Sequence, residues 1–195
     1  AYFVGLSEGG RIALDYATRR PERVDGLCVI GSGLSGYEPT DEREEAMWMD
    51  LARRDQEIGH LAGAGDTRRA IDALLDLWAP AIDRPTRQWA RGIALENHAA
   101  ALGRFDELQQ PIDPPAIRRL EAIGAPVLAL TGTKDFPAYE RVADLLVSRL
   151  PNAQKEALEG ADHLANLSRR EAFDAQLEGF LARLDFLAMR RGSTR

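Results

Sequence analysis

Val4-Gly5-Leu6-Ser7-Glu8-Gly9-Gly10 is the stretch that decides the fold, because it places a Gly-x-Ser-x-Gly pattern between an apolar strand end and an amphipathic helix. Residues 2–4 have the apolar character of a buried strand, and apolar residues recur at helical spacing after the pattern. A chain that reverses so sharply holds its central residue in strained backbone geometry, and the small residues Gly5 and Gly9 relieve the crowding. The pattern therefore predicts that Ser7 stands exposed at the start of a helix.

A serine in this position is suited to act as a nucleophile. The unmatched N–H groups and the positive dipole end of the following helix favour developing negative charge, so we expect the Glu8 N–H to donate to an oxyanion. The second donor of such a site is expected from an earlier loop, and this sequence contains none. The alternative is that the five-residue pattern occurs by chance and that Ser7 only caps the helix.

A nucleophilic serine needs a base, and the sequence offers three histidines. His163 follows an expected strand at 154–158 and precedes a helical pattern, so we expect it in a loop at the carboxyl end of a strand, the edge that would also display Ser7. His60 and His98 are better explained as surface or core histidines, although either could line a substrate pocket.

The base must be oriented by an acid, and Asp135 follows the apolar strand that ends at Gly132. The structural alternative is that Asp135 caps the helix that follows it, and both roles are compatible. Asp162 is a weaker candidate because neighbouring loop residues seldom aim their side chains at each other. Glu38, after the second strand, is a rarer acid position.

The order Ser7, Asp135, His163 differs from that of the chymotrypsin and subtilisin groups and is the order found in α/β-hydrolases. On these residues the chain resembles the α/β-hydrolase family along almost its whole length. The last block is similar to the histidine segment of enol-lactonase, esterase and cofactor-free haloperoxidase-like members. The resemblance is carried by 5–10, 132–135 and 160–163, followed by Asn166, Glu171, Ala172 and Phe173.

What the resemblance implies is a serine hydrolase that attacks an ester, lactone or related carbonyl of a small molecule and forms an acyl-enzyme. Ser7, His163 and Asp135 would be its triad, and no cofactor or metal would be needed. Two other readings stay open: a ligand-binding or receptor-type relative that is not catalytic, and an inactive fragment.

One departure from the family concerns the amino-terminal half. In the family the nucleophile follows about four strands and their helices, whereas here it is the seventh residue. We therefore expect an incomplete hydrolase sequence. Its first strand would expose an unpaired edge, so the isolated chain is expected to have low activity and poor stability and to be capable of self-association.

Strand-like and helical patterns alternate at both ends of the chain, which predicts an α/β fold with a parallel sheet flanked by helices, the carboxyl-terminal half of an α/β-hydrolase fold. The core is expected from residues 1–33 and 116–195, with a helical cap insertion at 34–115. We expect strands at 1–5, 25–31, 126–131 and 153–158, and helices at 8–19, 42–58, 67–78, 86–101, near Phe105, 138–150 and 168–187.

A cap of this kind, in members of the family, shapes the substrate pocket over the strand ends. The candidate pocket residues are therefore Trp48, Trp78, Trp89, His98 and Phe136, with Met47 and Met49 as further apolar candidates. The simpler alternative is that aromatic and methionine side chains at helical spacing pack the cap onto the core.

Composition narrows the class of protein. The 195 residues carry a net charge of −6 and are 45% hydrophobic, which suits a cytoplasmic enzyme and offers no basic surface for nucleic acid. The single cysteine, Cys28, is expected to be a buried core residue in a reducing compartment. No apolar run reaches membrane-spanning length, and no cysteine or histidine cluster has metal-ligand spacing.

Overall fold

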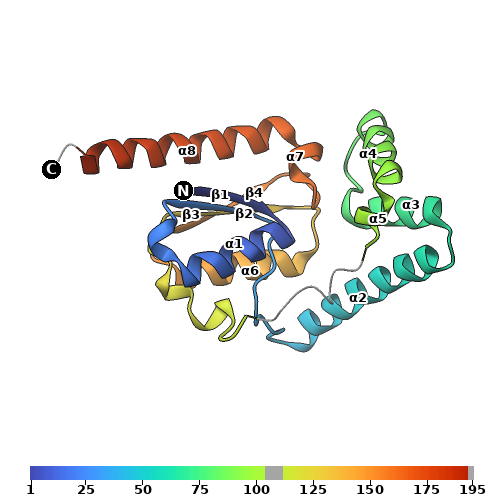
Figure 1. The fold of residues 1–195 in the computed structure, drawn as a ribbon, viewed down its shortest axis with the longest axis horizontal. Helices are drawn as coiled ribbons and strands as arrows, with labels where there is room; N and C mark the ends of the chain where they lie inside the picture. Colours follow the sequence, from blue (N-terminus) through green and yellow to red (C-terminus); the bar gives the residue numbers. More distant parts are fainter. Residues whose placement is uncertain (104–111, 193–195) are drawn as a thin grey trace. The chain divides into compact units, whose positions relative to one another are not determined.

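The computed structural model describes residues 1–103 and 112–192. The chain divides into two compact units, one formed by Ala1–Tyr37 with Ile112–Arg195 and the other by Glu38–Pro111 (Figure 1). The first unit contains a four-stranded sheet, which we call the sheet unit, and the second is built from helices, which we call the helical unit.

The sheet has the order β1-β2-β3-β4, and every pair of neighbouring strands is parallel. Because the strands are parallel and in register, their carboxyl ends meet at one edge of the sheet, where the loops that follow them gather. This confirms the α/β class and the parallel sheet predicted from the sequence. The strands are β1 (Tyr2–Leu6), β2 (Gly26–Ile30), β3 (Val127–Gly132) and β4 (Ala153–Leu158).

Helices cover both faces of this sheet: α1 (Glu8–Arg19) and α6 (Pro137–Arg149) lie on one face, and α8 (Arg170–Gly192), preceded by the short α7 (Ala165–Ser168), lies on the other (Figure 1). Successive residues of β2 pack into different clusters, as the two-residue period of a strand requires. Leu27 and Val29 join the cluster that includes α1 and α6, whereas Cys28 and Ile30 join the one that includes α8.

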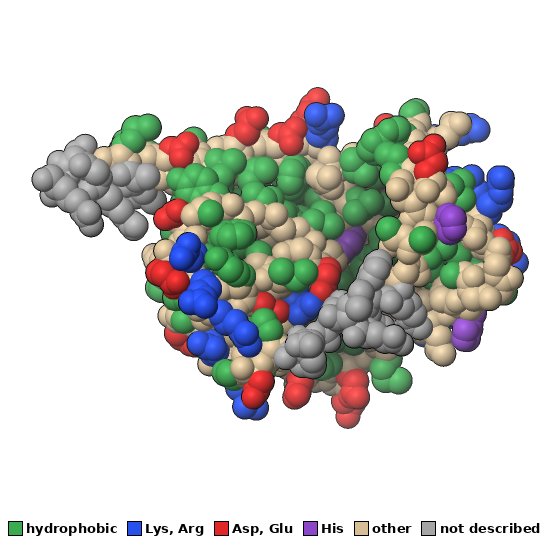
Figure 2. Space-filling model, viewed as in Figure 1, with side chains coloured by type: hydrophobic (Ala, Val, Ile, Leu, Met, Phe, Trp, Pro, Cys, Tyr) green, Lys and Arg blue, Asp and Glu red, His purple; other side chains and the backbone are tan. Residues whose placement is uncertain are grey.

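The outer edge of β1 is apolar and open. Tyr2 and Val4 on this strand and Ile12 and Tyr16 on α1 are exposed, and Val4 has half of its surface accessible. Figure 2 shows hydrophobic side chains gathered on this face of the sheet unit. The Tyr2 hydroxyl donates to Asp185 of α8 at 3.1 Å, which ties the strand to the helix above it.

The chain leaves and re-enters the sheet unit through two neighbouring segments. The Ile117 N–H donates to the Ser35 carbonyl at 3.1 Å, and a Cβ on Gly36 would lie 2.6 Å from the Pro115 ring. Gly36 has a φ of 78°, which suits glycine. Three short 3₁₀ helices complete the unit: η1 (Pro21–Arg23), η3 (Ala116–Arg118) and η4 (Leu120–Ala122).

In the helical unit, three helices begin at an aspartate cap. The side chains of Asp41, Asp66 and Asp83 accept the backbone N–H three residues ahead, which satisfies a donor that the first turn leaves open. The Asp72–Arg91 ion pair joins the second helix to the third. The helices are α2 (Glu42–Gly63), α3 (Thr67–Trp78), α4 (Arg84–Glu96) and α5 (His98–Ala101).

The observed elements differ from the expected ones mainly at helix ends. The helix expected at 86–101 is broken at Asn97 into α4 and α5, and the one expected from 168 is preceded by the separate turn α7. The short helix expected near Phe105 lies outside the described residues. Within the described residues, no helix is both long and apolar enough to cross a membrane.

Candidate active site

Ser7 occupies the turn between β1 and α1 in strained geometry. Its φ is 53°, and it is the single non-glycine residue with a positive φ in the described part of the chain. Such backbone costs about 1–3 kcal/mol and is found mostly at functional sites. A Cβ on Gly5 would overlap the Gly9 carbonyl oxygen, so glycine is required there. The Ser7 N–H donates to the Ile30 carbonyl at 2.8 Å, which ties the turn to β2.

The Ser7 side chain makes no capping hydrogen bond to α1, although the residue stands at the N-cap position. The alternative in which Ser7 serves only as a helix cap is therefore not what the geometry shows. Glu8 is the first residue of α1, so its N–H belongs to the turn whose donors have no partner within the helix.

Asp135 and His163 form a buried pair at the same edge of the sheet. The His163 Nδ1 lies 3.0 Å from Asp135 Oδ1 and 3.1 Å from Oδ2, and the two side chains are 6% and 4% exposed. Asp135 comes from the loop after β3 and His163 from the loop after β4. A carboxylate on Nδ1 holds the imidazole in the tautomer whose other nitrogen can accept a proton.

Backbone contacts fix these two loops against each other. The Lys134 N–H donates to the Ala161 carbonyl at 2.8 Å, and a Cβ on Gly132 would overlap that same carbonyl oxygen. Asp135 Oδ1 also accepts the Phe136 N–H at 2.6 Å. The N-cap position of α6 is Phe136 with no side-chain capping bond, so Asp135 does not act as the cap.

The other acid candidates make different contacts. The Asp162 carboxylate accepts the Leu164 N–H at 3.1 Å, a contact within its own loop. Glu38 is exposed and begins the helical unit. Asp135 is the candidate that the structure pairs with His163.

Tyr139 was not singled out from the sequence and belongs to this constellation. Its ring stacks on the His163 imidazole with centroids 5.0 Å apart and planes at 27°, and only 8% of the residue is exposed. Burial is the main cause that raises the pKa of its phenol, and the charge of Asp135 adds to it.

Gly31, directly after β2, packs against the acid–base pair. A Cβ on this residue would lie 2.7 Å from Asp135 Oδ2 and 2.9 Å from His163 Nδ1. The position has a φ of 48°, so glycine is favoured by the backbone as well as by the lack of space. The loop after β2 therefore fills the space beside the pair without contributing a side chain.

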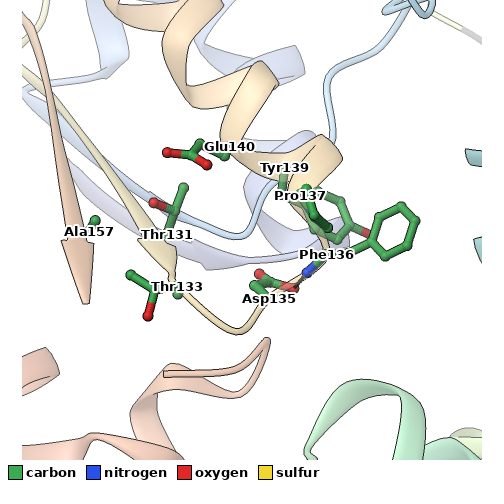
Figure 3. Close-up of a pocket in the computed structure, with 9 residues that line it drawn as sticks. Thr131, Thr133, Asp135, Phe136, Pro137, Tyr139, Glu140 and Ala157 are labelled. Atoms are coloured by element: carbon green, nitrogen blue, oxygen red, sulfur yellow. Dashed lines mark hydrogen bonds between the residues drawn. The ribbon is translucent and has the colours of Figure 1, made fainter. Parts of the chain in front are cut away.

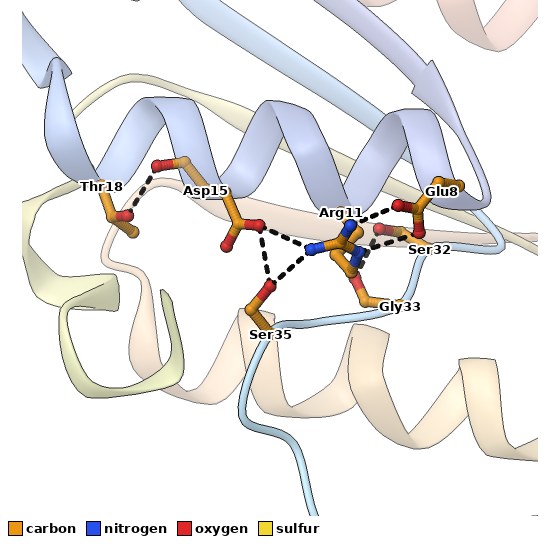
Figure 4. Close-up of polar contacts among 7 residues, drawn as sticks. All are labelled: Glu8, Arg11, Asp15, Thr18, Ser32, Gly33 and Ser35. Atoms are coloured by element: carbon orange, nitrogen blue, oxygen red, sulfur yellow. Dashed lines mark hydrogen bonds and ion pairs between the residues drawn. The ribbon is translucent and has the colours of Figure 1, made fainter. Parts of the chain in front are cut away.

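The same loop is bound to α1 by a polar network (Figure 4). Arg11 donates to Asp15 Oδ2 at 2.9 Å and to Ser35 Oγ at 2.9 Å, and Ser35 Oγ donates to Asp15 Oδ2 at 2.7 Å. Arg11 also forms an ion pair with Glu8. Because Asp15 is buried, these contacts fix α1 relative to the loop that carries Gly31.

A small hollow of about 120 Å³ opens beside Asp135 (Figure 3). Phe136, one of the candidate pocket residues, lines it together with Tyr139 and Glu140. The remaining lining residues are Thr131, Gly132, Thr133, Asp135, Pro137 and Ala157.

The other candidate pocket residues belong to the helical unit. Trp48 in α2 and Trp78 in α3 are half-buried, whereas Trp89 in α4 and His98 in α5 are exposed. Their role toward substrate stays a prediction. His60, at the end of α2, also lies in this unit. Within the described residues, no three His, Cys, Asp or Glu side chains are grouped as a metal site.

The parallel sheet and the Asp135–His163 pair at its carboxyl edge agree with the result of a comparison with known protein families. Residues 1–176 match the model of the alpha/beta hydrolase family, and the chain belongs to that family. The resemblance seen in the sequence is thereby confirmed.

Among individual proteins, the chain is 29% identical over 185 residues to a pimeloyl-[acyl-carrier protein] methyl ester esterase of Neisseria meningitidis serogroup A. It is 26% identical over 192 residues to a 2-hydroxy-6-oxononadienedioate/2-hydroxy-6-oxononatrienedioate hydrolase of Burkholderia vietnamiensis. These alignments cover 93% and 94% of this chain but 57% and 62% of the relatives. The structure of MenH from S. aureus shares the fold, with a TM-score of 0.70 at 19% identity over 94% of this chain and 68% of that chain.

Proposed function

We propose that this chain carries the triad of a serine hydrolase that cleaves esters of small carboxylic acids. The buried Asp135–His163 pair, at the sheet edge where Ser7 sits in a strained turn, is the observation that carries the proposal. Each of these three residues follows a different parallel strand of the sheet, which supports the proposal that they act together in the family order of nucleophile, acid and base.

The geometry supports a double-displacement mechanism. His163 takes the Ser7 proton as Oγ attacks the ester carbonyl, and Asp135 stabilises the imidazolium that forms. His163 then gives the proton to the departing alcohol, which leaves an acyl group on Ser7. Water, deprotonated by His163, attacks the acyl group, and Oγ recovers its proton as the carboxylic acid leaves.

The Glu8 N–H is the proposed donor to the oxyanion. It belongs to the first turn of α1, so the dipole of a twelve-residue helix also favours negative charge there. Loss of one oxyanion donor costs about a hundredfold or more in rate in serine hydrolases.

Substrate class is the finer part of the proposal. One relative is named for a methyl ester and another for an oxo-dienedioate, so a carboxylic ester is the first substrate to test and a carbon–carbon bond beside a carbonyl the second. Lactones would use the same triad. We propose that the helical unit acts as the cap and that Trp48, Trp78, Trp89, His98 and Phe136 are substrate-pocket residues.

A fluorophosphonate probe tests this proposal directly, because it labels a serine only when a base activates it. We expect one label per chain on Ser7, lost in Ser7→Ala and in His163→Ala. Ser148→Ala and His60→Ala are matched controls, since Ser148 bonds only to its own helix and His60 lies in the helical unit, and both should label normally.

Labelling that persists in Ser7→Ala would refute the assignment. If neither the wild type nor any variant is labelled, a catalytic function is not supported, and the chain is a binding module or an inactive fragment. If Ser7 is labelled, methyl esters, lactones and a carbon–carbon substrate compared at equal concentration would distinguish the substrate classes.

A further inference from the structure

The Arg11 guanidinium lies between two carboxylates of α1, the helix that follows Ser7 (Figure 4). Its Nε donates to Glu8 Oε2 at 2.8 Å, and its Nη2 donates to Glu8 Oε1. The remaining nitrogen, Nη1, donates to Asp15 Oδ2 and to Ser35 Oγ, each at 2.9 Å. All three guanidinium nitrogens are therefore engaged, and one positive charge serves two negative ones.

The two carboxylates stand in different surroundings. The Asp15 side chain is 5% exposed, whereas the Glu8 side chain is 48% exposed. The pairing of Asp15 is therefore a matter of stability, because a buried charge needs a partner. Glu8 directly follows Ser7, and its own N–H is the proposed oxyanion donor, so the pairing of Glu8 bears on the reaction.

A Glu8 carboxylate without its cation would oppose that reaction. When Ser7 Oγ attacks a carbonyl carbon, or the phosphorus of a fluorophosphonate, negative charge develops on an oxygen beside the Glu8 N–H. The carboxylate belongs to the same residue as the donor, so it stays within one side-chain length of that oxygen, and like charges repel. Its charge is felt in the site, since it joins burial and Asp135 among the causes that raise the pKa of Tyr139.

Arg11 also sets the direction of the Glu8 carboxylate. The free N–H groups of a first helical turn point out of its N-terminal end, whereas Arg11 lies three residues further along α1. Two parallel hydrogen bonds to a planar guanidinium fix the carboxylate in place. The contact therefore draws the carboxylate along the helix, toward Arg11 and away from the end that faces the oxyanion (Figure 4).

We propose that Arg11 is a positioning residue of this site, which neutralises the Glu8 carboxylate and holds it away from the oxygen that gains charge. Arg11 acts through Glu8 rather than on the reacting atoms. This inference rests on the proposed function and adds a residue that the family order of nucleophile, acid and base does not include.

Arg11→Gln removes the positive charge and keeps a polar side chain. We expect the limiting rate of fluorophosphonate labelling to fall about five- to tenfold, the effect of a like charge near a partly solvated oxyanion. In a Glu8→Gln background the same substitution should slow labelling by about twofold or less, because no carboxylate is left to neutralise. The matched control is Arg53→Gln, since Arg53 pairs with Asp50 and Glu57 on α2, and it should label at the wild-type rate.

Asp15→Asn separates this role from a purely structural one. Added to Arg11→Gln, it removes the orphaned buried charge and should recover part of the lost Tm, while labelling stays slow because the Glu8 carboxylate remains without its cation. All rates are compared at a temperature well below the Tm of every variant. Labelling that recovers together with Tm would mean that Arg11 acts only through the stability of α1, and the inference would be overturned.

The outcomes separate the two proposals. A labelled wild type in which Arg11→Gln has no effect, or the same effect with and without Glu8→Gln, overturns the role of Arg11 and leaves the serine hydrolase standing. An unlabelled wild type defeats the proposed function and this inference with it. A loss of rate that Glu8→Gln cancels and Asp15→Asn does not cancel supports the inference.

Discussion

At Gly31 the backbone has a φ of 48° and lies close to the acid–base pair of the site. A Cβ there would meet Asp135 Oδ2 at 2.7 Å and His163 Nδ1 at 2.9 Å, both below ordinary contact distance. The Asp135–His163 hydrogen bond therefore requires a residue without a side chain at position 31. An added methyl group must displace one of the two partners.

We predict that Gly31→Ala abolishes fluorophosphonate labelling and the low-field proton resonance of the Asp135–His163 hydrogen bond. The control is Gly65→Ala, since Gly65 has a φ of 79° with open space around it and suffers the same backbone strain of about 1 kcal/mol. If both variants keep the resonance and label alike, crowding at Gly31 does not matter.

The buried thiol of Cys28 makes the free energy of unfolding depend on pH in the alkaline range. Burial raises the pKa of its thiol to about 12, whereas a thiol in the unfolded chain titrates near pH 8.5, so the unfolded chain loses its proton first. The stabilising contribution is therefore complete below about pH 8.5 and is lost as the pH rises toward 12, by about 1.4 kcal/mol per pH unit.

The measurement is urea unfolding between about pH 8 and pH 10, in the wild type and in Cys28→Ala. The free energy of unfolding of the wild type should fall more steeply with pH, although the variant starts lower because it loses core packing. Parallel pH dependences would show that the thiol does not titrate differently in the two states.

At the scale of elements, α1 and the loop after β2 are fastened by Arg11, Asp15 and Ser35. The Asp15 side chain is only 5% exposed and forms an ion pair with Arg11 at 2.9 Å. Removal of one partner of a buried ion pair leaves an uncompensated charge, which costs about 3 kcal/mol or more. The same contacts place α1, and with it Ser7, beside the loop that carries Gly31.

We predict that Arg11→Met lowers the free energy of unfolding by about 3 kcal/mol and that adding Asp15→Asn restores part of the loss, because the orphaned charge is removed. Arg53→Met, which breaks an exposed ion pair on α2, should cost about 0.5 kcal/mol or less. Chemical denaturation of the four proteins gives these values. A double variant less stable than Arg11→Met would contradict the role of the buried charge.

Most elements could be predicted from the sequence because their signals are local. The glycines around Ser7, the apolar runs of the strands and the helical spacing after them depend on neighbouring residues. The pairing of Asp135 with His163 followed from two loops at the same sheet edge. Gly31 and Tyr139 could not be found in this way, because their importance comes from contacts between β2, α6 and the loop after β4 that no local pattern encodes.

For the molecule as a whole, the open edge of β1 governs behaviour in solution. Tyr2 and Val4 are exposed on an outer strand whose backbone can pair with another strand. We predict that the 195-residue chain associates as its concentration rises, measured by light scattering after size exclusion. Val4→Lys should reduce this association, because a charge on an edge strand disfavours pairing.

Met49→Lys is the control for that experiment. Met49 is an apolar residue on α2 in the helical unit that is even more exposed than Val4, 66% against 50%. If it reduces association as much as Val4→Lys, the β1 edge is not the cause. A chain that stays monomeric at every concentration would show that the edge does not promote association.

The meeting of Ser35 with Ile117, and of Gly36 with Pro115, has an evolutionary meaning. The chain therefore leaves the sheet unit and returns to it at neighbouring positions, and the helical unit is a continuous insertion between them. Insertions, deletions or replacement of that insertion would leave the strand order and the loops that carry Asp135 and His163 unchanged. Selection could therefore vary the helical insertion while the parallel sheet and the loops at its carboxyl edge are inherited unchanged.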